Sequence, residues 1–152
     1  MEPLRSESSM EDFLDIDLDK FRAFFSADRW AAAAGAVIDT VREDLVECSM
    51  EITAIHRNAG GAVQGGAIFT LADLAFAVHS NLDMVCGAAV GITVGQSCSI
   101  SYLKSTRGKR LIASSVCLSK GKSMAVYRIS IRDDLGVPIA EMIGNGFTTA
   151  KK

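Results

Sequence analysis

Residues 56–81 read HRNAGGAVQGGAIFTLADLAFAVHSN, and this stretch decides the fold of the chain. Its first half is a glycine-rich turn, and its second half is a helix pattern that is apolar on nearly every face. A helix of this kind is normally buried within a protein. Its one carboxylate, Asp73, is costly to bury unless another group pairs with it or a reaction uses it. Asp73 is therefore the first candidate for a functional residue.

The length and composition of the chain indicate one globular domain. The 152 residues are 49% hydrophobic and 22% charged, enough for one sizeable core and too few for two ordinary domains. The net charge of −2 argues against nucleic acid or an anionic membrane as the general partner. No apolar run reaches the length of a membrane span, and the acidic N-terminus lacks a signal-peptide stretch. We therefore expect a cytoplasmic protein with no membrane partner.

Periodicity on either side of residues 56–81 predicts one helix and several antiparallel strands. We expect residues 1–16 to form a flexible lead-in and residues 17–152 to form the domain. A helix is predicted over Leu18–Ala34, ending at Gly35, with an aromatic stripe that either packs on the domain or lines an apolar groove. The predicted strands are Ala36–Val41, residues 45–55, Gly91–Lys104, Arg110–Lys120, Ser123–Asp133 and Val137–Ala150.

This order of elements favours an α+β fold in which one antiparallel sheet wraps around the central helix. A single curved sheet covers only part of a helix. A second copy of the chain is the expected means of burying the rest and of protecting an edge strand.

The cysteines and histidines do not form a metal-ligand pattern. Cys48, Cys86, Cys98 and Cys117 are scattered, so we expect reduced and mostly buried thiols. A metal site needs clustered ligands, and the only histidines, at positions 56 and 79, are expected to be structural.

The element order and the central stretch resemble the hotdog-fold acyl-CoA thioesterases, and within them the PaaI-type (phenylacetate-pathway) branch. The family pattern is H-N-x-x-G-x-x-H-G-G-x-x-x-x-L-x-D, and the likeness in element order spans about Phe24 to Thr149. The positions in register are Asn58, Gly61, Gly65, Gly66, Leu71 and Asp73. The resemblance implies a hotdog fold, with a long central helix wrapped by a curved antiparallel sheet.

Two positions depart from the family pattern. Arg57 stands where the pattern has its first histidine, and Gln64 stands where it has the second. Gln64 can still donate a hydrogen bond but cannot carry a proton at neutral pH. A thiolate leaves without much protonation because a thiol pKa is only about 8.5. We therefore expect the departures to affect rate and substrate preference more than reaction type.

The glycines predict where a thioester carbonyl would bind. Gly65 and Gly66 open the helix, where free N–H groups and the positive end of the helix dipole lie. Glycine also lets a carbonyl approach the backbone closely, and we assign carbonyl polarisation to the Gly65 N–H. Asp73 follows eight residues later, roughly 12 Å along the helix. One chain therefore cannot easily bring both groups to one carbonyl.

The resemblance implies a solution to this separation. In the family, Asp73 of one subunit would face Gly65 and Asn58 of the other, giving a homodimer with composite sites and a dimer of dimers (a homotetramer). Asp73 would act as general base on water or as nucleophile through an anhydride, and these alternatives stay open. Asn58 would orient the water or the carboxylate, and Thr93 matches a small hydroxyl residue that could hold the same water.

Coenzyme A carries several phosphates, so a basic rim is expected around the site. Lys104 and Arg107 belong to one hairpin, and Lys122 and Ser123 belong to the next; with Gly66 they are the predicted CoA-binding residues, although such clusters are also common in solvated turns. The predicted reaction is hydrolysis of an aromatic or medium-chain acyl-CoA to the free acid and CoA, without a cofactor or metal. The alternative is a hotdog protein that binds acyl-CoA without turnover.

Overall fold

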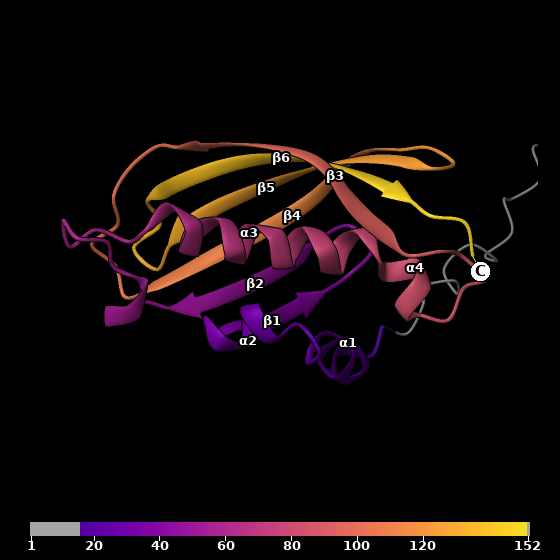
Figure 1. Cartoon of the computed structure of the whole chain (residues 1–152), viewed down its shortest axis with the longest axis horizontal. Coiled ribbons are helices and arrows are strands. Elements are labelled where there is room, and N and C mark those ends of the chain that lie inside the picture. Colours follow the sequence, from indigo (N-terminus) through magenta and orange to yellow (C-terminus); the bar gives the residue numbers. More distant parts are fainter. Residues whose placement is uncertain (1–15, 152) are drawn as a thin grey trace, which may run out of the picture.

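Six antiparallel strands form one sheet in the computed structural model, which describes residues 16–151 (Figure 1). The strand order is β1-β2-β4-β5-β6-β3. The expected lead-in lies outside the described residues except at Ile16, which packs against the core. The strands are β1 (Ala36–Val41), β2 (Val46–Glu51), β3 (Thr93–Tyr102), β4 (Arg110–Lys120), β5 (Met124–Asp133) and β6 (Pro138–Thr148).

The helix α3 (Gly65–Ser80) lies along one face of this sheet (Figure 1). It contacts all six strands, and the predicted hotdog arrangement is confirmed. Its buried residues are Ile68, Leu71, Ala72, Leu74, Ala75, Phe76, Val78 and His79. The other residues of α3 are exposed or half-buried. Apart from Gly65 and Ala67 in its first turn, they form one open stripe, which consists of Gly66, Phe69, Thr70, Asp73, Ala77 and Ser80. The sheet thus covers only part of the helix, as the sequence predicted.

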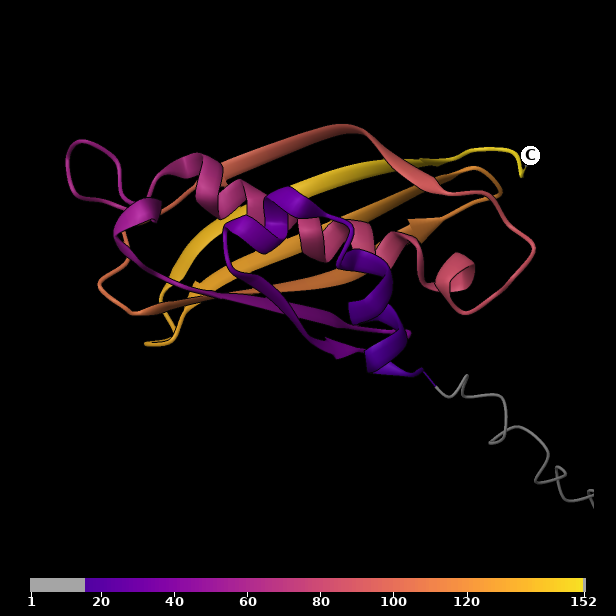
Figure 2. The same cartoon turned by 60° about the horizontal axis from the view of Figure 1, so that its bottom comes forward.

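The single helix predicted over Leu18–Ala34 is wrong, because the structure has two shorter helices. They are α1 (Leu18–Phe25) and α2 (Arg29–Ala33). The Asp28 carboxylate accepts a hydrogen bond from the Ala31 N–H at 2.9 Å and starts a second helix. Gly35, with φ of +77°, follows α2 at the predicted end. Figure 2 shows α1 and α2 on the same side of the sheet as α3, and α2 contacts both β1 and α3.

The strand predicted to end at residue 55 stops at Glu51 and is followed by a short 3-10 helix, Ala54–His56. His56 is buried within this turn, where its Nδ1 accepts from the Thr53 N–H at 2.9 Å. Its Nε2 therefore carries the proton and donates to the Ala34 carbonyl at 2.7 Å. These bonds tie the end of α2 to the segment that precedes α3.

His79 also has a structural position, near the C-terminal end of α3. Its ring nitrogens lie 3.0 Å from the Ser115 hydroxyl and 3.1 Å from the Glu43 carbonyl oxygen. Burial disfavours the charged imidazolium and lowers the pKa of His79 below its ordinary value of 6.5. A short helix, α4 (Leu82–Val85), follows α3.

The strand β3 forms one edge of the sheet and runs beside α3 in the opposite direction. Tyr102 lies at the start of α3, where its hydroxyl donates to the Gly65 carbonyl, and Thr93 lies at the helix end, where Asn81 binds its backbone. The strand reads TVGQSCSISY and contains neither charge nor proline. Natural edge strands usually carry such residues to prevent pairing with other chains. The free edge of β3 is therefore suited to pairing with another strand.

The four cysteines are free thiols, as predicted, but their burial differs from the prediction. Cys48 is buried, Cys86 is half-buried, and Cys98 and Cys117 are exposed. The expectation that most would be buried is wrong, since Cys98 belongs to the edge strand and Cys117 to the outer end of β4.

Candidate functional site

The N-terminus of α3 presents two backbone donors. Within residues 16–151, neither the Gly65 N–H nor the Gly66 N–H has a hydrogen-bond acceptor. Gln64 caps the helix, because its Oε1 accepts from the Ala67 N–H at 3.0 Å. Free N–H groups and the positive end of the helix dipole make this terminus favourable for a developing negative charge.

Two side-chain amides add further donors at the same end. The Asn58 Oδ1 accepts from the N–H groups of Gly60 at 3.0 Å and Ala62 at 3.1 Å. Asn58 and Gln64 thus both use their amide oxygen on the backbone, which fixes the orientation of each amide. In the part of the chain that the structure describes, neither NH₂ group has an acceptor. The site is therefore rich in hydrogen-bond donors and poor in acceptors.

A side chain at either glycine would displace a neighbouring side chain of the site. A Cβ on Gly65 would lie 3.1 Å from the Tyr102 Cζ, and a Cβ on Gly66 would lie 2.6 Å from the Gln64 Oε1. Tyr102 also donates a hydrogen bond to the Gly65 carbonyl at 3.1 Å. The sequence places Tyr102 within the predicted strand Gly91–Lys104, and no spacing rule relates that strand to the start of the helix.

Asp73 lies near the middle of α3, on its open stripe. Its side chain is exposed within one chain, so the expectation of a buried carboxylate is wrong at this level. Partial enclosure by neighbouring atoms, followed by the negative charge of Asp28, raises the pKa of the Asp73 carboxyl. The helix rise still separates Asp73 from Gly65 by roughly 12 Å.

Thr93, Lys122 and Ser123 lie at the opposite end of α3 from the glycines. The Thr93 hydroxyl lies 2.8 Å from that of Thr148, and its N–H donates to the Asn81 Oδ1 at 2.8 Å. Thr93 and Lys122 line one cavity of about 140 Å³ there, and the Ser123 carbonyl accepts from the Thr148 N–H at 2.7 Å. One chain therefore does not bring these residues to Gly65, which lies roughly 24 Å away along the helix.

The predicted basic residues have different surroundings. Lys104 lines a cavity of about 380 Å³ together with Asn58, Gly65 and Tyr102, and Arg107 is exposed on the following loop. Arg110, by contrast, pairs with Asp39 at 3.3 Å and Glu51 at 3.6 Å. Lys120 pairs with Asp83 at 2.5 Å. The hairpin predicted around Lys104 and Arg107 is wrong, because β3 and β4 are not neighbours in the sheet and this segment crosses from one edge strand to the middle. It nevertheless places Lys104 beside the donors at the start of α3, whereas the β4–β5 hairpin with Lys122 lies at the other end of the helix.

A second cavity, of about 570 Å³, adjoins the other side of the α3 N-terminus. It lies between α2, the 3-10 helix and the first turns of α3. Its lining residues are Trp30, Ala33, Ala34, Ile55, His56, Gln64, Gly66, Ala67 and Thr70. Most of these side chains are apolar and none is a lysine or arginine, whereas the cavity on the other side includes Lys104.

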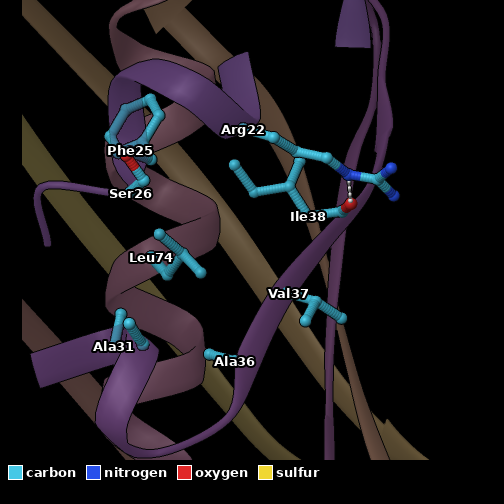
Figure 3. A pocket seen from close by; sticks show the side chains of 9 residues that line it. Arg22, Phe25, Ser26, Ala31, Ala36, Val37, Ile38 and Leu74 are labelled. Atoms are coloured by element: carbon cyan, nitrogen blue, oxygen red, sulfur yellow. Dashed lines mark hydrogen bonds between the residues drawn. The ribbon is translucent and has the colours of Figure 1, made fainter. Parts of the chain in front are cut away.

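A third cavity, of about 410 Å³, lies between α1, α2 and β1 (Figure 3). Arg22 donates from Nε to the Ile38 carbonyl at 2.9 Å. Figure 3 shows that its guanidinium lies beyond Ile38, away from Phe25 and Leu74. The only charge in the lining thus points away from the hollow, and we assign it no chemistry.

Residues 16–151 hold no group of three or more His, Cys, Asp or Glu side chains that could bind a metal ion. Among the helices of these residues, none is long and apolar enough to cross a membrane.

Comparisons with known proteins agree with the fold. A family model described as the thioesterase superfamily matches residues 60–140. The acyl-coenzyme A thioesterase PaaI of Escherichia coli is 33% identical over 110 residues, which cover 72% of this chain and 74% of that protein. The solved structure of the E. coli PaaI protein, from the phenylacetic acid degradation operon, superposes with a TM-score of 0.76. That alignment has 25% identity and covers 88% of this chain and 96% of the other.

Two further relatives match over a smaller share of their length. A protein of Deinococcus radiodurans, provisionally named an esterase, is 36% identical over 104 residues. The match covers 68% of this chain and 66% of the relative, and a similar protein of Archaeoglobus fulgidus is covered over 62% of its length. This chain thus spans just under two thirds of these relatives.

The raised pKa of Asp73 predicts the effect of its removal on stability. A carboxyl with a higher pKa in the folded state binds a proton more readily when folded, so its ionisation lowers the free energy of unfolding as the pH rises above its ordinary value of 3.8. At pH 7, Asp73→Asn should therefore have a melting temperature equal to or above that of the wild type. The difference should shrink towards pH 4, measured by calorimetry. Glu43→Gln, at an exposed carboxylate, is the control, and a lower melting temperature for Asp73→Asn at pH 7 would show that Asp73 is a stabilising surface charge.

Proposed function

The chain belongs to the thioesterase superfamily, as a PaaI-type hotdog protein, and from this premise we propose that it hydrolyses acyl-CoA thioesters to the free acid and CoA. One observation carries the proposal: two backbone N–H groups and two side-chain NH₂ groups at the start of α3 have no acceptor among the described residues. A thioester carbonyl supplies the missing acceptor. Its oxygen gains negative charge during attack, so donors held in advance stabilise the transition state more than the ground state.

The Gly65 N–H, with that of Gly66, would polarise the thioester carbonyl. In other acyl-transfer enzymes one such donor is worth about 3 kcal/mol. Gln64 would add its NH₂ group, which is a donor but not an acid. The CoA thiolate would leave without needing a proton, because its pKa is low compared with that of an alcohol or amine.

Asp73 would be the base that activates water, or the nucleophile that forms an anhydride. Burial and the charge of Asp28 raise its pKa above the ordinary carboxyl value, which strengthens it as a base. It cannot serve Gly65 of its own chain, roughly 12 Å away along the helix. The carboxylate for this carbonyl would therefore come from a second copy.

A two-fold dimer would solve the separation. Pairing of the free β3 edges would bring two α3 helices side by side, open stripe to open stripe, running in opposite directions. An axis that places Asp73 opposite Gly65 of the partner subunit passes near residue 69. It then brings the far end of α3, with Thr93 and Lys122, to the partner's Asn58 loop. All the predicted site residues, separated within one chain, would gather in each composite site.

The acyl group would be aromatic or medium-chain. The reaction would need no cofactor, because CoA enters as part of the substrate. A dimer of dimers, a cytoplasmic location and a single domain over residues 17–152 stay predictions.

Thiol release from a panel of acyl-CoA esters tests the activity. The wild type should hydrolyse at least one aromatic or medium-chain ester, and Asp73→Asn should lose about 100-fold or more in kcat, the scale of a general base. Glu43→Gln serves as the control and should keep wild-type activity. If neither the wild type nor Asp73→Asn releases thiol while both bind CoA esters, the chain is a binding protein, and Gln64→His is the substitution to try for restoring turnover.

Mixed dimers test the composite site. Asn58→Asp keeps the oxygen that holds the loop and removes the NH₂ donor, so it should be inactive, as should Asp73→Asn. If the two residues of a site come from different chains, each mixed dimer contains one intact site. Random co-assembly of the two variants should then restore about one quarter of wild-type activity. Sites built within one chain would give no recovery, which would refute the composite arrangement.

A further inference from the structure

We propose that Trp30 forms the wall of the acyl-binding pocket and determines which acyl groups the protein accepts. The pocket is the cavity of about 570 Å³ beside Gly66. This volume lies within the range of about 300–1,000 Å³ that is usual for small-molecule sites. The proposal rests on the thioester function proposed above.

Two unusually exposed apolar side chains face this cavity. Ile55 is 75% exposed and Trp30 is 74% exposed, the two highest values among the large apolar residues of the described chain. Isolated exposed apolar residues are common and need no explanation. Two of this size lining one cavity form an apolar surface that favours an apolar ligand.

Trp30 is held in place despite its exposure. Its indole Nε1–H donates to the Thr70 hydroxyl at 3.0 Å, and that hydroxyl donates to the Gly66 carbonyl at 2.8 Å. The indole is thereby linked to the first turn of α3, beside a free backbone N–H. A side chain fixed in this way keeps one face available without the entropy cost of ordering it on binding.

The polarity of the two sides of the α3 N-terminus orients the substrate. The Trp30 side is lined mainly by apolar groups, including Ala33, Ala34 and Ala67. The other side also has apolar lining residues, but it carries the charged side chain of Lys104, together with Asn58 and the hydroxyls of Ser105 and Thr106. A thioester whose carbonyl binds at the Gly65 and Gly66 N–H groups would therefore direct its acyl group towards Trp30 and its charged CoA towards Lys104.

Small residues make up much of the remaining lining and leave room for an acyl group beside Trp30. Ala33 and Ala34 belong to α2, while Gly66 and Ala67 belong to the first turn of α3. The occupant we propose is an apolar acyl chain or ring. The acetyl group of acetyl-CoA is too short to fill the pocket. Discrimination between long and short acyl groups should therefore depend on Trp30.

Kinetics with paired substrates test this role. Trp30→Ala should lower kcat/KM about 10-fold or more for octanoyl-CoA and phenylacetyl-CoA, while acetyl-CoA changes by about twofold or less. Thr70→Val, which removes the anchor of the indole, should produce a smaller loss in the same direction. Phe24→Ala, an exposed aromatic in α1 outside the cavity, is the matched control and should leave the ratio unchanged. A substrate ratio unchanged in Trp30→Ala would overturn the proposal.

A binding measurement separates this proposal from the proposed activity. Trp30 is the only tryptophan of the chain, so its fluorescence reports on this cavity alone. Octyl-CoA, a thioether that cannot be hydrolysed, should shift the emission, and CoA without an acyl group should not. A shift in a protein that hydrolyses no ester would support the pocket and reject the activity, whereas turnover without a shift would reject the pocket. Dissociation of the oligomer by Trp30→Ala would show instead that a second copy covers this face.

Discussion

A helix that is apolar on nearly every side must be covered on nearly every side, and the rest of this structure depends on that constraint. The sheet buries eight residues of α3 and leaves a stripe that includes Asp73 open. The same sheet ends in β3, an edge strand without charge or proline. An incompletely covered helix and an unprotected edge lie on the same side of the fold. Both needs would be met by one two-fold contact, which is also the contact that the proposed chemistry requires.

The proposed site follows from the lack of hydrogen-bond acceptors at the start of α3. Gln64 and Asn58 each commit an amide oxygen to the backbone, and Gly65 and Gly66 have N–H groups without acceptors among the described residues. The resulting cluster of donors suits an oxygen that becomes negative, while the carboxylate that would attack stands roughly 12 Å along the same helix. Separating donors and base by two helical turns prevents one chain from pairing them internally. In the proposed dimer, Asp73 would therefore be available for a substrate held by the partner.

Much of this fold could be predicted from the sequence, because it depends on local rules. Periodicity located the strands and α3, and the glycines marked the start of that helix. The break between α1 and α2 was missed because the apolar periodicity continues across Asp28, so this residue was not identified as a helix cap. Tyr102 was not assigned to the site, and the aromatic stripe that includes Trp30 was left as either a packing face or the lining of an apolar groove. Both positions depend on packing between elements that are distant in sequence. The exposure of Asp73 could not be predicted either, since an apolar helix pattern does not show whether its own sheet or a second chain covers each residue.

The most direct measurement is a crystal structure with a ketone analogue of an acyl-CoA, in which a CH₂ group replaces the thioester sulfur. The account predicts that the ketone oxygen lies within hydrogen-bonding distance, about 3 Å, of the Gly65 or Gly66 N–H. The Asp73 carboxylate nearest to that carbonyl carbon should belong to the other chain. An analogue bound away from the start of α3, or one approached by Asp73 of the same chain, would contradict it.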